Sequence, residues 1–134
     1  MFEIVHQNTT HVYSLAEAQA MLPLIYRITE EASKKVKYLM ACVEALPDKK
    51  SERALDFQAQ GNKLVDQWQQ KLERLGVRPK GLWLADFDCG DGYYCWKFPE
   101  VKILYKHGYQ DGFTGRILIA SEEVHLNENS HRPN

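Results

Sequence analysis

Large apolar side chains alternate with other residues between positions 83 and 105, and this pattern constrains the fold more than any other feature of the sequence. Alternation with a period of two is typical of β-strands that bury one face. If Pro99 and Glu100 form a turn, the flanking strands pair so that one face of the hairpin is wholly apolar, which predicts their register. The expected pairs are Phe98 with Val101, Trp96 with Ile103 and Tyr94 with Tyr105.

A second turn is expected at residues 89–92, where the sequence Cys-Gly-Asp-Gly is typical of a tight connection. This turn adds a third strand to the same apolar face. His107, which is predicted to lie opposite Gly92, is the last residue of that face. A fourth short strand is expected at residues 116–120. The pairs predicted across the second turn are Phe87 with Tyr94, Ala85 with Trp96 and Trp83 with Phe98.

Helix signals precede the sheet. Ser14 and Glu17 form a capping box, in which each side chain satisfies a backbone donor at the other position, so a helix is expected from Leu15. Pro23 lacks the backbone donor that a helix interior needs. A short helix that bends near Leu22 into a longer one is therefore expected.

Two apolar stripes with helical spacing predict a long antiparallel hairpin of helices. One covers residues 24–46 and ends before Pro47, and the other covers residues 51–75 and ends before Gly76. A helix of more than twenty residues is about 30 Å or longer, whereas a strand of six residues spans about 20 Å. Because the sheet is too short to cover this hairpin, a second copy is expected to cover the remainder in a two-fold, four-helix core.

The fold class predicted is therefore α+β: a long antiparallel helical hairpin packed on a small, three- to four-stranded antiparallel sheet. Residues 1–120 are expected to form a single domain, since 134 residues lie near the commonest domain size. The polar residues 121–134 are expected to be a disordered tail. For residues 1–13, an edge strand and a frayed terminus both remain open.

Charge and composition argue against several classes of function. Seventeen basic and eighteen acidic residues give a net charge of -1, which provides no general attraction to nucleic acid or to an anionic membrane. The sequence shows no signal peptide and no run of eighteen apolar residues, so a cytoplasmic protein without a membrane span is expected. Three cysteines without a CxxC pair are expected to be reduced thiols.

The face of the sheet opposite the aromatic side chains is predicted to be solvated, because aspartates and lysines share it. Three lysines beside an aromatic ring are also compatible with nucleic-acid binding, but the two aspartates weaken that interpretation. Cys95 has no histidine neighbour in the predicted register and is interpreted as structural. The side chains assigned to this face are Asp86, Asp88, Tyr93, Cys95, Lys97, Lys102, Leu104 and Lys106.

One group of side chains has the chemistry of a metal or ligand site. The predicted register places His107 at the same end of the sheet as Cys89 and Asp91, and the glycine-rich loop with Asp111 and Arg116 begins there. Imidazole, thiolate and carboxylate are ligands of zinc and similar divalent ions, so Cys89, Asp91 and His107 are candidate metal ligands. A second hypothesis is a small-ligand site made by His107, Asp111 and Arg116, because glycine amides and a guanidinium suit an anion.

Structural alternatives exist for the same residues. A histidine at the end of an apolar strand commonly hydrogen-bonds to a turn, and aspartate beside glycine is typical of turns. Arg116 is expected to tie its loop down through Asp111 or backbone carbonyls, or to pair across a subunit interface. No cofactor other than a possible divalent metal ion is indicated by the sequence.

Several short motifs occur in a fixed order along the chain. Over residues 13–119 they are Leu15, Glu17, Ala18, Leu22, Pro23, Leu24, Asp86-Phe87, Cys95-Trp96-Lys97, Glu100, Ile103, His107, Gly112-Phe113 and Gly115-Arg116. This ordered set resembles the bacterial family catalogued as domain of unknown function 2203, which implies a small cytoplasmic bacterial protein and carries over no established activity. The family pattern has Gly-Glu at Pro99-Glu100 and Trp-His-Glu at Lys106-His107-Gly108, so an acidic neighbour of the histidine is absent here.

Two functions from different classes follow. The leading hypothesis is a non-enzymatic binding or assembly module that forms a homodimer through its helical hairpin, because the sequence has a long helical surface and no recognisable nucleophile or nucleotide motif. A different protein partner is compatible with the same surface. The alternative is a small-ligand-binding or metal-dependent enzyme with a site at the His107 end of the sheet.

Overall fold

The predicted capping box between Ser14 and Glu17 forms, with side chain to backbone bonds of 2.9 and 3.0 Å, and it begins helix α2 (Leu15–Glu44). The helix runs unbroken through Pro23, so one element replaces the expected short helix followed by a long one. Proline removes one backbone hydrogen bond from a helix. The turns before and after it bury leucine and isoleucine side chains in the same core, and this packing offsets the lost bond.

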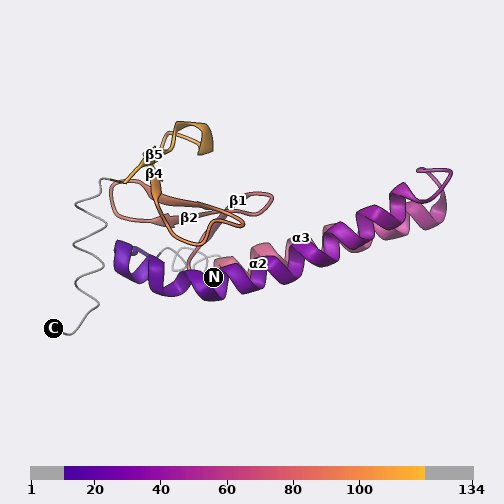
Figure 1. Ribbon diagram of the computed structural model, residues 1–134, viewed down its shortest axis with the longest axis horizontal. Helices are drawn as coiled ribbons and strands as arrows, with labels where there is room; N and C mark the ends of the chain where they lie inside the picture. The colour runs from indigo at the N-terminus through magenta and orange to yellow at the C-terminus, as the bar shows by residue number, and fades with distance from the viewer. Residues whose placement is uncertain (1–10, 120–134) are drawn as a thin grey trace, which may run out of the picture.

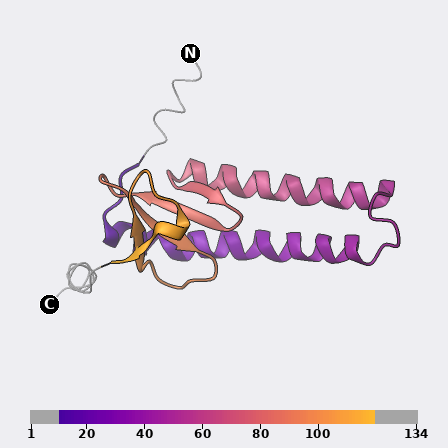
Figure 2. The same ribbon diagram turned by 90° about the horizontal axis from the view of Figure 1, so that it is seen from above.

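Helix α3 (Glu52–Arg74) confirms the second predicted helix. Ser51 caps its first turn by accepting a hydrogen bond from the Ala54 amide at 3.1 Å. Leu75 is the C-terminal cap, and Gly76 follows with a positive φ of 78°, the left-handed conformation that commonly ends a helix. The two helices lie side by side and antiparallel, as Figure 2 shows.

The computed structural model describes residues 11–119, and within them the hairpin carries a five-stranded antiparallel sheet over one end (Figure 1). The α+β class is confirmed. Residues 11–13 form no strand, and the alternatives for residues 1–10 and the tail expected at residues 121–134 lie outside the described residues. The strands, in the order of the sheet, are β1 (Arg78–Gly81), β2 (Leu84–Asp88), β3 (Tyr93–Lys97), β4 (Tyr105–His107) and β5 (Ile117–Leu118), with a short 3-10 helix, η1 (Phe113–Gly115), before β5.

Strand β1 is the one strand that the sequence did not predict. It contains Pro79 and only four residues, and proline is disfavoured in strands because it lacks a backbone donor. The strand lies at the edge of the sheet, where a missing donor faces no neighbour on one side. An edge position therefore explains why a proline is tolerated there.

The register predicted across residues 89–92 is correct. Ala85 pairs with Trp96 and Phe87 pairs with Tyr94 in the β2–β3 ladder. The Cys89 amide donates to the carbonyl at the far side of the turn at 2.9 Å, and Gly90 takes a positive φ of 95°. Glycine at this position provides the left-handed conformation at no steric cost.

The register predicted between β3 and β4 is wrong by one residue. Tyr94 lies opposite Lys106 rather than Tyr105, and His107 lies opposite Tyr93 rather than Gly92. Because side chains alternate between faces, a shift of one residue moves every side chain of β4 to the other face of the sheet. His107 therefore lies on the face that the sequence analysis assigned to solvent.

The shift arises in the connection between the two strands. A turn closed by the bond from the Glu100 amide to the Lys97 carbonyl contains a cis Phe98-Pro99 peptide, and the chain then leaves the sheet until Tyr105. Ile103 is fully buried, but the side-chain amide of Gln19 in α2 satisfies both of its backbone groups at 2.9 and 3.0 Å. A helix side chain thus replaces the strand partner that the alternating pattern predicted for Ile103.

The core lies between the sheet and the nearer half of the hairpin. It joins α2, the end of α3, β2 and β3, and its largest fully buried side chains include both Trp68 and Trp96. The farther half of the hairpin projects beyond the sheet in both views (Figures 1 and 2). The buried cluster consists of Tyr13, Leu15, Ala18, Leu22, Ile25, Trp68, Leu72, Val77, Ala85, Phe87, Tyr94, Trp96, Ile103 and Ile119.

Candidate functional site

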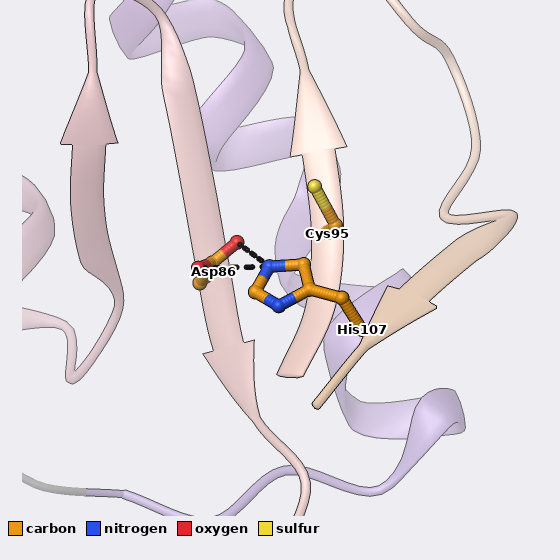
Figure 3. A group of neighbouring side chains, drawn as sticks. All are labelled: Asp86, Cys95 and His107. Carbon is orange, nitrogen blue, oxygen red and sulfur yellow. Dashed lines mark hydrogen bonds and ion pairs between the residues drawn. The ribbon is translucent and has the colours of Figure 1, made fainter. Parts of the chain in front are cut away.

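The observed register gathers three potential metal ligands on the outer face of the sheet, by which we mean the face turned away from the helices. Asp86 in β2 lies opposite Cys95 in β3, and Tyr105 in β4 pairs with Cys95 on its other side. His107 is two residues after Tyr105 and so lies on the same face. Three adjacent strands therefore contribute one side chain each, as Figure 3 shows. One ligand atom from each lies within 4.8 Å of the others.

Asp86 and His107 form a buried pair. The Nε2 atom of His107 is 3.2 Å from each carboxylate oxygen of Asp86 (Figure 3). The side chains are 2% and 3% exposed, so water cannot replace either partner. A polar group that is buried in this way is costly without its partner, and the pair is expected to be held together strongly.

The other ring nitrogen of His107 faces the backbone. Nδ1 lies 2.9 Å from the Gly108 carbonyl oxygen, which can only accept a hydrogen bond. A neutral imidazole carries one ring proton, so it can donate from Nδ1 to the Gly108 carbonyl or from Nε2 to the Asp86 carboxylate, but not to both. When the proton is on Nδ1, the lone pair of Nε2 faces the Asp86 carboxylate, and a further proton or a cation between the two satisfies both atoms.

Cys95 is the third member of the group and is 2% exposed. Burial, and then the neighbouring Asp86 carboxylate, raise the pKa of the Cys95 thiol to about 12, although Arg116 acts in the opposite direction. Burial also raises the pKa of Asp86, against the lowering effects of His107 and Lys80. Both acids thus favour their protonated forms more than they would in water.

The outer face is covered, so the prediction of a solvated face is wrong for this part of the sheet. Tyr93, Asp88 and His107 are each less than a tenth exposed. Tyr109 from the loop after β4 packs its ring edge-on against Tyr93, with centroids 5.0 Å apart, and donates a 2.7 Å hydrogen bond to Asp88. That bond raises the pKa of Tyr109 to about 12.

Arg116 closes the same loop from its other end. Its guanidinium donates two hydrogen bonds to the Glu100 carboxylate at 2.7 and 3.1 Å. The guanidinium carbon also lies 4.0 Å from the centre of the Tyr105 ring and 4.3 Å from that of Phe113. An acid engages Arg116 as the structural interpretation predicts, but the acid is Glu100 and not Asp111.

The structure brings some of the sequence-predicted site residues together and separates others. Cys89 donates to Asp91 at 3.4 Å, and burial with that contact raises the pKa of Cys89 to about 11. Asp111 accepts a hydrogen bond from the Gly108 amide at 3.2 Å and shapes the loop. Within residues 11–119, the potential metal ligands that cluster with His107 do not include Cys89 or Asp91.

Asp86 and Cys95 were not predicted as partners of His107. Both residues were assigned to the outer face, and only the position of His107 was wrong. The signal that could have found the group is the alternation in β2 and β3, which places Asp86 and Cys95 directly opposite each other. The observed register, with His107 opposite Tyr93, then brings His107 next to both residues.

A separate surface feature lies on the projecting half of the hairpin. A shallow groove between the two helices is lined by Lys34, Lys35, Tyr38, Leu39 and Leu64. Tyr38 is 69% exposed, although large aromatic side chains are usually buried. Three of the five lining side chains are aromatic or aliphatic, and the aliphatic stems of the two lysines extend the apolar surface.

Comparison with known proteins gives one match. A family described as "Uncharacterized conserved protein (DUF2203)" matches residues 11–119. No curated protein and no solved structure matches the chain. Within the described residues, no helix is both long and apolar enough to cross a membrane.

Proposed function

Since the chain belongs to the DUF2203 family of uncharacterized conserved proteins, which assigns no activity, we propose from its geometry that it is an assembly module that forms a homodimer. The interface proposed is the distal hairpin, defined as residues 30–64. The observation that carries this proposal is the length of the two helices relative to the sheet that covers them.

The helices extend well beyond their own sheet. At about 1.5 Å per residue, the 30 residues of α2 span about 45 Å and the 23 residues of α3 about 35 Å. Strands of at most five residues span about 17 Å. The distal hairpin consequently projects past the sheet (Figure 2), and no strand packs over it in that view.

The distal hairpin exposes apolar side chains that a monomer would leave in water. Tyr38, Met40 and Leu55 are 69%, 45% and 54% exposed. Tyr38 and Met40 are about 200° apart around α2 and lie on opposite sides of the buried Leu39. Burial of apolar surface is worth about 25 cal/mol per Å², so covering the exposed side chains on either side of the hairpin favours association. The groove beside Tyr38 offers a complementary recess on the same hairpin.

A second copy is the occupant that this surface suits. A two-helix hairpin has a single seam between its helices and no enclosed core. Two hairpins together form a four-helix bundle, which does enclose a core. A two-fold interface uses the same patch on both partners, and here each copy carries both a projecting Tyr38 and an apolar recess lined by Leu39 and Leu64.

Light scattering coupled to gel filtration tests the proposal at micromolar protein concentration. The wild-type chain is expected at twice its 15.6 kDa mass. Tyr38→Glu adds a charge to the interface and is expected to yield a folded monomer with an unchanged circular dichroism spectrum. Gln67→Glu adds the same charge to an exposed position of α3 outside the distal hairpin and is expected to remain a dimer.

Two outcomes would overturn the proposal. One is a wild-type chain that is monomeric throughout the micromolar range. The other is a Tyr38→Glu variant whose dimer is as stable to dilution as that of Gln67→Glu, because the distal hairpin would then lie outside the interface.

A further inference from the structure

We propose that Asp86, Cys95 and His107 form a binding site for a zinc-class divalent metal ion. This site is independent of the dimer, because it lies on the outer face of the sheet and the proposed interface lies on the distal hairpin. Three observations carry it: the identity and spacing of the ligand atoms, the orientation of the imidazole, and the balance of charge around the group.

The spacing of the ligand atoms suits a small cation. From bond lengths of about 2.0 Å to nitrogen and oxygen and about 2.3 Å to sulfur, neighbouring ligand atoms around tetrahedral zinc are about 3.3 to 3.7 Å apart. The Nε2 atom of His107 and the Oδ2 atom of Asp86 are already 3.2 Å apart. The sulfur of Cys95 lies within 4.8 Å of a ligand atom of each partner. It must therefore approach by up to about 1.3 Å to reach the separation of about 3.5 Å between sulfur and nitrogen or oxygen around zinc.

The imidazole of His107 is oriented as a metal ligand. Ligating histidines commonly donate their other ring N–H to a backbone carbonyl or a carboxylate, which fixes the tautomer and the plane of the ring. Here Nδ1 lies 2.9 Å from the Gly108 carbonyl, and Nε2 points at the Asp86 carboxylate. With the ring proton on Nδ1, a divalent ion between Nε2 and the carboxylate satisfies both acceptors at once.

Charge balance also favours the ion. A divalent cation bound by the Asp86 carboxylate and the Cys95 thiolate forms a neutral group, and neutral groups are the ones that burial tolerates. Arg116 lies beside Cys95, but its charge is already matched by two hydrogen bonds to Glu100. The guanidinium therefore does not leave an unmatched positive charge next to the metal.

The donor set selects the metal. Thiolate and imidazole ligands suit Zn²⁺ and related transition metals, while Mg²⁺ and Ca²⁺ prefer oxygen ligands throughout. Three protein ligands leave one tetrahedral position for water or another small ligand. When the ion binds, the thiol of Cys95 loses its proton to solvent, and a sulfur–metal bond forms without any change in oxidation state.

Titration of the metal-free full chain with Co²⁺ tests the site, because a thiolate bound to Co²⁺ gives a charge-transfer absorption band in the near ultraviolet. The expected result is a band that saturates at one Co²⁺ per chain and disappears when Zn²⁺ is added. The full chain contains five histidines, and exposed histidines that bind Co²⁺ alone produce no thiolate band. Saturating Co²⁺ without a band would overturn the proposal.

Cysteine variants identify the ligand. The chain has three cysteines, so in Cys42→Ser/Cys89→Ser the only remaining thiol is Cys95. Both replaced cysteines are only partly buried, and neither belongs to the buried core cluster. This double variant is expected to keep the full band. If the band is lost in it, the assignment of Cys95 as the ligand is refuted, and this test does not depend on whether Cys95→Ser folds. His107→Gln is expected to weaken Co²⁺ binding by at least about 10-fold. An unchanged affinity in His107→Gln would equally overturn the site.

Discussion

At the scale of single residues, Arg116 joins three parts of the chain that are distant in sequence. Its two hydrogen bonds reach Glu100 beside the turn after β3, and its planar face lies between Tyr105 of β4 and Phe113 of η1. The side chain is only 16% exposed. A lysine has neither the fork for two parallel bonds nor the planar surface for stacking.

Arg116→Lys is therefore expected to lower the free energy of unfolding by about 1 to 3 kcal/mol, because Glu100 loses its matched partner. Thermal or urea denaturation measures the change. Arg53→Lys is the control, since Arg53 is exposed and lies 5.7 Å from the Phe57 ring without a buried acid partner among the described residues. Equal stability of the two variants would contradict the structural role. Reduced stabilisation by phosphate in Arg116→Lys alone would indicate a ligand role instead.

At the scale of secondary-structure elements, the helices of the hairpin are joined by a buried hydrogen bond. Trp68 in α3 donates from Nε1 to the Thr29 hydroxyl in α2 at 2.8 Å, and both side chains are at most 1% exposed. The indole N–H has no water to replace this acceptor. Its satisfaction depends on a hydroxyl group at residue 29.

Thr29→Val is expected to destabilise the protein by about 1 to 3 kcal/mol, because it keeps the shape of threonine but leaves the indole N–H unpaired. Thr29→Ser keeps the hydroxyl and removes one methyl group, for which a loss of about 0.8 kcal/mol is expected. Denaturant midpoints of the two variants give the comparison. A valine variant more stable than the serine variant would show that packing, and not the hydrogen bond, governs this seam.

Replacing either of two glycines by alanine is expected to change stability, but in opposite directions. A Cβ atom at Gly92 would lie 2.5 Å from the His107 backbone oxygen, whereas one at Gly61 in α3 would meet nothing within 4 Å. Gly92→Ala is expected to destabilise by about 1 to 3 kcal/mol by forcing β3 and β4 apart. Gly61→Ala is expected to stabilise by about 0.5 to 1 kcal/mol, since alanine favours helix. Thermal melts of both variants that move in the same direction would disprove this account.

The elements also show what the sequence could predict. The capping box placed the start of α2, and apolar spacing placed α3. The β2–β3 register followed from alternating aromatic residues across a short turn. The β3–β4 register failed because Ile103 is buried from a loop and paired by Gln19, an interaction between residues 84 positions apart. Local pattern contains no information about a partner so distant in the chain.

The prediction of the candidate site failed for the same reason. His107 was predicted as a ligand, whereas Cys95 was interpreted as structural and Asp86 as part of a solvated face. Which side chains meet His107 depends on a one-residue register. Strand β1 was missed because its proline and its short length hide it among turn residues. Side-chain chemistry could thus be read from sequence more reliably than side-chain proximity.

At the scale of the whole molecule, the two halves of the hairpin differ in how they are supported. The nearer half packs against the sheet, and the distal hairpin depends on its own seam unless a second copy covers it. Segments with fewer packed neighbours open with lower free energy. A dimer stabilises its interface by mass action, so opening of that region must depend on protein concentration.

Hydrogen exchange measured at two protein concentrations is expected to reveal this dependence. Amides of residues 30–64 should exchange more slowly when the protein is concentrated enough to be dimeric. Amides of β2 and β3 serve as the internal control, and their exchange should respond less because the sheet lies outside the proposed interface. Exchange of residues 30–64 that is the same at both concentrations would argue against association through the distal hairpin.

The projecting hairpin has a hydrodynamic consequence. A chain of 134 residues whose longer helix spans about 45 Å has a larger Stokes radius than a sphere of equal mass. It will therefore elute early from a gel-filtration column even as a monomer, in the range expected of a larger globular standard. Elution volume alone would be mistaken for dimerisation, and only a shape-independent mass can distinguish an elongated single chain from a pair.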